Sequence, residues 1–250
     1  MRLLIAIPVY NELQYVNAVL DQVAQYHREV LVVDDGSTDG TAEVLAGRPD
    51  IQLIRHESNQ GYGQSLIDAF RYADDNGYDW VITMDCDEQH EPRRIPQFIR
   101  AIHKDRWDII SGSRYLKASK EDDLPPGDRR TINATLTATI NDLFGWNLTD
   151  AFCGYKAHRV SAMRRLNLTE TGYAFPMQLW PQAHKAGLRI KEIPVRLIYK
   201  DPNRQFGGLL NDASHRLAHY LDVLKRETAK PLVSAAEPEP AVTCCCSCDQ

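Results

Sequence analysis

The stretch WVITMDCDEQH, residues Trp80–His90, decides the fold. Its first five residues are apolar apart from one threonine, and a run of this kind predicts a strand that is buried on both faces. Two acids follow at once, Asp85 and Asp87. Because side chains alternate along a strand, the two carboxylates are expected to point the same way and Cys86 the opposite way. Mg²⁺ and Mn²⁺ prefer carboxylate oxygen and fill their other positions with water and phosphate. The stretch therefore predicts a metal and diphosphate site.

Two other interpretations of these acids have to be considered. A calcium-binding EF-hand loop that began at Asp85 would need glycine at its sixth position and glutamate at its twelfth, where this chain has His90 and Pro96. The sequence therefore argues against calcium. A solvated turn with exposed acids fits the short motif alone, so the rest of the chain has to decide.

The composition is that of a globular protein. The chain has 250 residues, of which 43% are hydrophobic and 25% charged, enough for one large α/β domain or two small ones. Its net charge of −5 argues against a nucleic-acid-binding protein. The longest apolar stretches, such as Leu3–Val9, are far shorter than the about 20 residues of a membrane span, and no signal peptide opens the chain. We expect a cytoplasmic protein.

The cysteines form no disulfide framework. Four of the six crowd the last seven residues, which leaves only Cys86 and Cys153 in the body of the chain. The segment 229–250 is rich in Pro, Glu, Ala and Ser, a composition that predicts disorder. Its cysteine cluster has three open interpretations: it binds a soft metal, it is acylated, or it has no role.

Short apolar runs alternate with helical patterns along the first half. The predicted strands are Leu3–Val9, Val30–Val33, Ile51–Ile54, Trp80–Met84 and Ile109–Ile110. Apolar residues at helical spacing separate them, for example Val16, Val19, Leu20 and Val23. Runs that are apolar throughout indicate an α/β fold with a mostly parallel central sheet flanked by helices. Ligands bind at the carboxyl ends of such strands, where Pro8–Glu12, Asp34–Ser37 and Asp85–Asp87 are expected to meet.

The second half has a different character. A charged loop, Lys117–Asp128, precedes a helix with Ile132, Leu136, Ile140 and Leu143 on one face, which suits a lid or an acceptor-side element. The segments predicted after it are a strand-like Ala151–His158, a helix near Phe175–Lys185, a strand at Arg189–Val195, a basic loop Lys200–Gly208 and a helix Leu209–Arg226.

The chemistry of the second cluster fits a nucleotide. Asp34 and Asp35 can accept hydrogen bonds from a nucleobase N–H or a ribose hydroxyl, and Gly36 permits a sharp turn. The segment Gly61–Gly63 lacks the third glycine of a dinucleotide fingerprint, because Leu66 stands in its place. NAD binding is therefore disfavoured.

Four segments together resemble the family 2 glycosyltransferases over about residues 2–208. They are Ile7–Glu12, Val33–Thr41, Asn59–Gly63 and Asp85–Pro92. With Gly112–Tyr115 and Asp150–Lys156, the chain looks most similar to dolichyl-phosphate mannose synthases and related polyprenyl-phosphate sugar transferases. The resemblance implies a fold of the glycosyltransferase-A type in one domain, residues 1–228. Its nucleotide-sugar and metal half would span 1–115 and its acceptor half 116–228.

The resemblance also implies roles for single residues. The base and ribose of a nucleotide-sugar donor would contact Pro8, Tyr10, Glu12, Asp34 and Asp35. Asp85 would bind the ribose or the metal, and Asp87 with Gln89 would bind the metal, Mg²⁺ or Mn²⁺. The phosphate of the acceptor would contact Arg114, Arg129 or Arg130, and Lys200 or Arg204.

The acceptor decides the mechanism that is expected. A lipid phosphate is already anionic, so in-line attack on the anomeric carbon needs positioning more than a base. A hydroxyl acceptor would need a carboxylate to take its proton, and Asp150 is the candidate. The predicted catalytic residues are Asp87, Arg114 and Asp150.

Two segments on the acceptor side depart from the family pattern. Gln178 stands where a carboxylate is usual, and the basic loop Lys200–Gly208 is irregular. No transmembrane anchor is expected at the carboxyl end. A lipid acceptor would then be met from the cytoplasmic membrane surface, through a partner subunit or through the helix Ile132–Leu143.

We expect a metal-dependent, inverting hexosyltransferase that uses a polyprenyl phosphate acceptor. GDP-mannose is the first choice of donor and UDP-glucose the second. The alternatives are a sugar or protein hydroxyl as acceptor, a sugar-1-phosphate nucleotidyltransferase, and a non-catalytic nucleotide-sugar-binding subunit. The nucleotidyltransferase is disfavoured because Pro8–Glu12 replaces the glycine-rich, arginine-containing loop that would follow its first strand.

Overall fold

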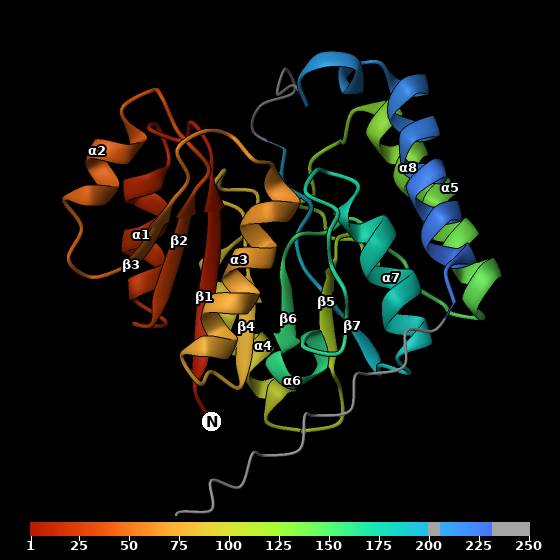
Figure 1. Cartoon of the computed structure of the whole chain (residues 1–250), viewed down its shortest axis with the longest axis horizontal. Coiled ribbons are helices and arrows are strands. Elements are labelled where there is room, and N and C mark those ends of the chain that lie inside the picture. Colours follow the sequence, from red (N-terminus) through yellow and green to blue (C-terminus); the bar gives the residue numbers. More distant parts are fainter. Residues whose placement is uncertain (200–205, 232–250) are drawn as a thin grey trace, which may run out of the picture.

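The structure is a computed structural model that describes residues 1–199 and 206–231. These residues form a seven-stranded sheet with the order β3-β2-β1-β4-β6-β5-β7 (Figure 1). The strands are β1 (Leu3–Val9), β2 (Val30–Asp34), β3 (Gln52–Arg55), β4 (Trp80–Thr83), β5 (Ile109–Ser113), β6 (Lys156–Arg159) and β7 (Ile190–Pro194). All neighbours pair in parallel except β6, which is antiparallel to both β4 and β5. The α/β fold with a mostly parallel sheet is confirmed.

Helices cover both faces of the sheet. They are α1 (Val16–Ala24), α2 (Thr41–Ala46), α3 (Tyr62–Asp75), α4 (Ile95–Ile102), α5 (Gly127–Phe144), α6 (Val160–Met163), α7 (Phe175–Lys185) and α8 (Ala213–Ala229), with short 3₁₀ helices η1 (Pro92–Arg94) and η2 (Gly208–Asn211). On β1, Ile5 and Ile7 pack against α1 and α4, while Leu4 and Ala6 belong to the cluster that contains α3 and α7. Helix α8 packs against α7 and α5 and runs beside α5 at the right of Figure 1.

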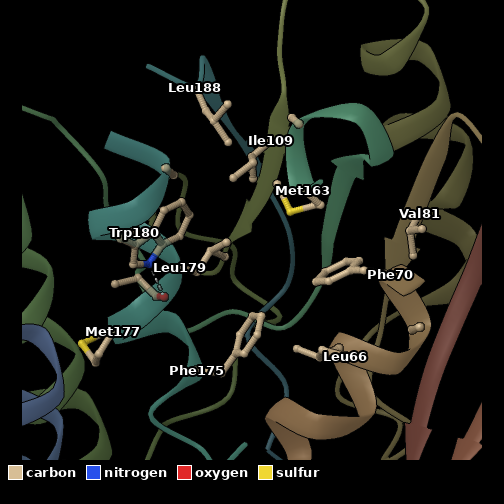
Figure 2. Packing of buried hydrophobic residues seen from close by; sticks show 14 of the residues in the cluster. Leu66, Phe70, Val81, Ile109, Met163, Phe175, Met177, Leu179, Trp180 and Leu188 are labelled. Carbon is tan, nitrogen blue, oxygen red and sulfur yellow. Dashed lines mark hydrogen bonds between the residues drawn. The ribbon is translucent and has the colours of Figure 1, made fainter. Parts of the chain in front are cut away.

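The larger core lies between the sheet and helices α3, α6 and α7. Figure 2 shows Phe175 and Trp180 of α7 pointing toward the same interior as Leu66 and Phe70 of α3. Trp180 is fully buried, and its indole N–H donates to the Ala151 carbonyl at 2.9 Å. This satisfied polar contact fixes the segment that enters β6.

Two predicted elements begin later in the chain than the sequence suggests. The strand predicted from Ala151 starts at Lys156, because the Asp150 carboxylate accepts the N–H groups of Phe152 and Cys153, which are then unavailable to a strand ladder. The helix predicted from Leu209 is a 3₁₀ turn followed by α8, whose cap is Asp212 accepting the His215 N–H at 2.8 Å.

Strand β4 is shorter than predicted. It ends at Thr83, and the N–H of Asp85 donates to Nδ1 of His90 at 2.9 Å instead of to a strand. Strand alternation is therefore the wrong reason for the direction of the two acids, which lie in a loop. Within the part of the chain that is described, no helix is both long and apolar enough to cross a membrane.

Candidate active site

A cavity of about 1130 Å³ is lined in part by residues that follow β1, β2, β4 and β5. The carboxyl ends of these strands lie at the top of Figure 1. The acidic residues that line it follow β1, β2 and β4, which are neighbours in the sheet, and we call this side the carboxylate end: Glu12, Asp35, Asp39, Asp85 and Asp87. The arginines that line it follow β5, on the far side of β6, or lie in α5 and α8, and we call this side the guanidinium end: Arg114, Arg129 and Arg216. One continuous space thus brings together groups that bind cations and groups that bind anions.

The loop after β4 supplies the oxygen ligands expected for a metal. Asp85, Asp87 and Gln89 all line the cavity. The Asp87 carboxylate accepts the Gln89 N–H at 3.1 Å and the Gln89 side-chain amide at 2.8 Å. The residue between them, Glu88, has a φ of 58°, a costly conformation for a side chain of that kind. The loop is therefore held in a specific shape.

This donor set fits Mg²⁺ or Mn²⁺. Two carboxylates and an amide oxygen are hard ligands, and Mg²⁺ usually takes only one or two carboxylates and completes its shell with water and phosphate. Among the residues that the structure describes, no three His, Cys, Asp or Glu side chains are grouped as a complete metal site. The arrangement suits an ion that arrives with a phosphate-bearing ligand.

Neighbours of Asp85 fix its position. The Tyr62 hydroxyl donates to its carboxylate at 3.2 Å. His90 accepts the Asp85 N–H, and burial lowers the pKa of His90 to about 4, so the ring is neutral and can accept. A Cβ atom on Gly154 would lie 2.7 Å from the Tyr62 hydroxyl and 2.8 Å from the Asp85 carboxylate. Only glycine leaves that carboxylate undisturbed.

The structure separates the residues predicted to bind the nucleoside. Pro8, Tyr10, Glu12 and Asp35 line the cavity. Asp34 does not line it: its side chain is fully buried, and one of its oxygens accepts the N–H of Ser37 at 3.0 Å. The structure gives Asp34 no carboxylate surface that faces the cavity, so it does not fit the predicted role of a ligand residue.

Arg114 and Asp150 form a buried ion pair. Two nitrogens of the Arg114 guanidinium donate to the carboxylate at 2.7 and 2.9 Å, and the Asn133 amide donates to it at 2.8 Å. Burial alone would raise the pKa of Asp150, but Arg114 and these hydrogen bonds outweigh it and hold the pKa well below its usual range. For Arg114, burial opposes the charge and Asp150 again outweighs it, so its pKa is raised.

The role of Asp150 as a general base is therefore corrected. Its two oxygens together accept from Arg114, Asn133 and the backbone N–H groups of Phe152 and Cys153, and it does not line the cavity. A carboxylate with a depressed pKa and no open face is a poor proton acceptor. Its hydrogen bonds instead fix the direction of the Arg114 guanidinium.

Of the other residues predicted to bind the acceptor phosphate, one lines the cavity and one does not. Arg129 lines the guanidinium end, with its guanidinium carbon 4.9 Å from the ring centre of Phe206. Arg130 is exposed and is not among the residues that line the cavity, and its guanidinium carbon lies 3.7 Å from the ring centre of Tyr115. Lys200 and Arg204 lie outside the described residues.

Helix α8 contributes two residues that the sequence reasoning missed. Arg216 is only 2% exposed, and its guanidinium donates to the Leu210 carbonyl at 2.6 Å. It also pairs with Asp128 of α5, and its guanidinium carbon lies 4.4 Å from the ring centre of Phe206. Tyr220, one turn later, also lines the cavity. The signal was present, since Arg216 stands four residues before Tyr220 on the apolar face of a predicted helix, where a lone cation is unusual.

Gln178, one of the departures from the family pattern, lies away from the cavity. Its carbonyl accepts the N–H groups of Thr169 and Glu170, and its amide donates to Glu227 of α8 at 3.0 Å. The carboxylate at this place in the fold is therefore supplied by α8, and the pair joins α7 to α8.

Comparison with known proteins identifies the family of the chain. Residues 4–166 match the family model described as "Glycosyl transferase family 2". The chain is 30% identical over 224 residues to an undecaprenyl-phosphate mannosyltransferase of Micrococcus luteus, covering 85% of this chain and 91% of that one. It is 27% identical over 233 residues to a polyprenol monophosphomannose synthase of Mycolicibacterium smegmatis, covering 88% and 86%.

A solved structure shows the same fold. Glucosyl-3-phosphoglycerate synthase of Mycobacterium tuberculosis, crystallised with Mn²⁺ and UDP, superposes with a TM-score of 0.69 at 17% identity and covers 92% of this chain and 81% of that one. Fold, site and family model agree: the chain is a glycosyltransferase and belongs to family 2.

Proposed function

We propose that this protein transfers a hexose from a nucleoside diphosphate sugar to a polyprenyl phosphate, in a single inverting displacement that depends on Mg²⁺ or Mn²⁺. The observation that carries the proposal is the single cavity with a carboxylate end and a guanidinium end. Such a cavity suits two anionic substrates that must meet at one carbon atom.

The carboxylate end binds the donor. Pro8, Tyr10, Glu12 and Asp35 surround the base and ribose. Asp85, Asp87 and Gln89 would hold the metal ion, which would neutralise negative charge on the diphosphate as it leaves. The strained Glu88 backbone and the Gln89 hydrogen bonds hold this loop ready for that ligand, so little reorganisation is needed on binding.

The guanidinium end binds the acceptor phosphate. Arg129 and Arg216 provide charge there, and Arg114 is aimed by its bond to Asp150. The aromatic rings of Tyr199, Phe206 and Tyr220 line the same end and offer apolar contact to a prenyl chain.

The chemistry needs no general base at this end. An anionic phosphate oxygen attacks the anomeric carbon from the side opposite the diphosphate, the bond to the diphosphate breaks, and the configuration inverts. The role of the protein is to hold the two reactants in line. The saturated hydrogen bonding of Asp150 disfavours a hydroxyl acceptor, because such an acceptor would need that carboxylate as its base.

The relatives support the acceptor class and leave a choice of donor. Two of them are named for transfer of mannose to undecaprenyl phosphate or polyprenol phosphate, and one from Methanococcus voltae is named for transfer of N-acetylglucosamine from UDP to dolichyl phosphate. GDP-mannose is our first choice of donor and UDP-glucose the second. We place the reaction at the cytoplasmic face of the membrane, reached through a partner subunit or through α5.

The test is a direct transfer assay. Purified protein is incubated with Mn²⁺ or Mg²⁺, GDP-mannose or UDP-glucose, and a short polyprenyl phosphate, and the labelled sugar that enters the organic phase is counted. Lipid-linked sugar that disappears in an Asp87→Ala variant supports donor, acceptor and metal together. Metal-dependent hydrolysis of the donor without a lipid product would contradict the proposed lipid acceptor. Absence of turnover with every donor would contradict the proposed transfer reaction.

A further inference from the structure

A buried histidine links the carboxylate end to helix α3. His56 follows β3 directly and is 7% exposed. Its Nδ1 lies 2.7 Å from an oxygen of Asp35, and its Nε2 lies 3.1 Å from an oxygen of Asp68. Each ring nitrogen thus lies within hydrogen-bond distance of one carboxylate oxygen.

Asp35 has little freedom under these contacts. One of its oxygens accepts from His56 and from the Gln60 N–H at 2.7 Å, and the other accepts from the Gly61 N–H at 2.8 Å. A carboxylate offers about four acceptor positions, so roughly one remains. Asp35 is 2% exposed and lines the cavity, which is where that remaining position is useful.

The second carboxylate is a firm anchor. Asp68 lies in α3 and also accepts from the Gln64 amide at 2.9 Å and from Arg71 at 3.3 Å. The start of α3 is fixed in turn, because the Gln64 N–H donates to the Thr171 carbonyl at 3.1 Å. The imidazole therefore cannot rotate without losing its contact with one of the two carboxylates.

We infer that His56 is a positioning residue for nucleotide binding: it holds the Asp35 carboxylate so that its last acceptor position faces an N–H or O–H group of the nucleoside. The inference rests on the donor part of the proposed function, and it does not depend on the acceptor. Nothing in the His56 ring needs to touch the ligand, since its effect passes through Asp35.

Two substitutions separate the two hydrogen bonds. Asparagine places its amide nitrogen near the δ position of the ring, so His56→Asn keeps a donor for Asp35 and loses the one for Asp68. Glutamine places its nitrogen near the ε position, so His56→Gln keeps the donor for Asp68 and loses the one for Asp35. Asp68→Asn is the matched control at the anchor.

The measurement is calorimetric titration of each variant with UDP and with GDP in the presence of Mn²⁺, beside its thermal unfolding midpoint. For the nucleotide that the wild type binds, we expect His56→Gln to weaken the affinity about tenfold, the effect of one lost hydrogen bond to a charged group. His56→Asn and Asp68→Asn are expected to stay within about twofold of the wild type. With turnover, the KM for the donor rises in His56→Gln while kcat and the KM for the acceptor stay unchanged.

Three results would overturn the inference. The first is that all variants bind the nucleotide with the affinity of the wild type. The second is that His56→Gln and His56→Asn weaken the affinity equally and both lower the unfolding midpoint, and the third is that the wild type binds neither UDP nor GDP. Failure of lipid transfer with the expected nucleotide affinities would sink the proposed acceptor and leave the role of His56 standing.

Discussion

The carboxylate end of the cavity is made by loops, whereas two of the three arginines at the guanidinium end come from helices. At the first, Asp35 and Asp87 follow β2 and β4, and backbone N–H groups of the same or an adjacent loop bind their oxygens. At the second, Arg129 and Arg216 come from α5 and α8, far apart in the chain, and Arg216 is held by the side chain of Asp128. The carboxylate end is thus set by local backbone geometry, while the guanidinium end depends on how two helices pack.

This difference predicts that a substitution at one end of the cavity does not change ligand binding at the other end. Donor affinity and acceptor affinity should respond separately, and residues that touch both ends should be few. Four experiments break or sharpen that separation.

The largest effect is expected at the carboxylate end. Asp87→Asn removes one of the two carboxylates proposed to hold the metal ion, so we expect kcat to fall by at least about 10³-fold, because charge on the leaving diphosphate would lose its stabilisation. Transfer rates at saturating substrate measure this. The neighbouring Glu88→Gln is the matched control, since Glu88 does not line the cavity. A Glu88→Gln variant as slow as Asp87→Asn would point to loop shape rather than to the ligand.

A smaller effect is expected at the guanidinium end. Arg216→Ala removes a buried cation that lines the cavity, so the KM for the lipid phosphate should rise about thirtyfold while the KM for the donor stays constant. Steady-state kinetics with each substrate varied in turn measures both. Arg226→Ala, on the exposed side of the same helix, is the control. A rise in the donor KM as well would break the separation of the two ends.

The next effect concerns Gly154, which touches the carboxylate end from the segment before β6. In Gly154→Ala the new methyl group meets the Asp85 carboxylate and the Tyr62 hydroxyl. Each of these groups is the tip of a side chain that can move, so the protein should fold with the Asp85 carboxylate displaced. We expect kcat/KM for the donor to fall about tenfold. Gly127→Ala, whose Cβ meets nothing within 4 Å, is the control. Unchanged donor kinetics would show that Asp85 is dispensable.

The smallest effect is expected on the stability of the protein and concerns β6, the strand between β4 and β5. His158 of β6 is 1% exposed, and burial, with a smaller contribution from Lys156, lowers its pKa to about 3. Between pH 6.5 and about 3 the unfolded chain binds a proton that the folded chain does not, so stability falls as the pH falls, by at most about 1.4 kcal/mol per pH unit. Above pH 6.5 this dependence vanishes, because His158 is neutral in both states.

His158→Phe tests this sign. The variant cannot titrate, and Nδ1 of His158 has no hydrogen-bond partner to lose. Its free energy of unfolding in urea, compared between pH 7 and pH 5.5, should decrease by about 1 kcal/mol less than that of the wild type. Equal decreases in both proteins would show that His158 does not contribute, and activity at pH 7 should be the same in both.

The sequence predicted the loop-built end better than the helix-built end. Strand β1 has the predicted bounds because its residues are apolar without interruption, and α7 matches its predicted range as well. Asp85, Asp87 and Asp35 follow strands whose ends meet at one edge of a parallel sheet, so their convergence is implied by strand order.

The failures have physical reasons as well. Asp34 and Asp35 are neighbours, and only the strand twist and the turn decide which one faces the cavity. Arg216 reaches the cavity only because α8 packs on α5 and α7, a long-range contact that no local pattern contains. The sequence suggests Asp150 as a general base, and only the structure reveals the four residues that donate hydrogen bonds to its carboxylate.

The antiparallel strand β6 has a consequence for synthesis of the chain. It is bonded to β4 on one side and β5 on the other, although it follows both in sequence. While ribosomes make the stretch between Thr83 and Lys156, at about 5–20 residues per second, the growing chain carries β4 for several seconds as an unpaired strand edge. During that interval the edge of β4 is open to pairing with other chains, and β6 closes it when it adds to the sheet.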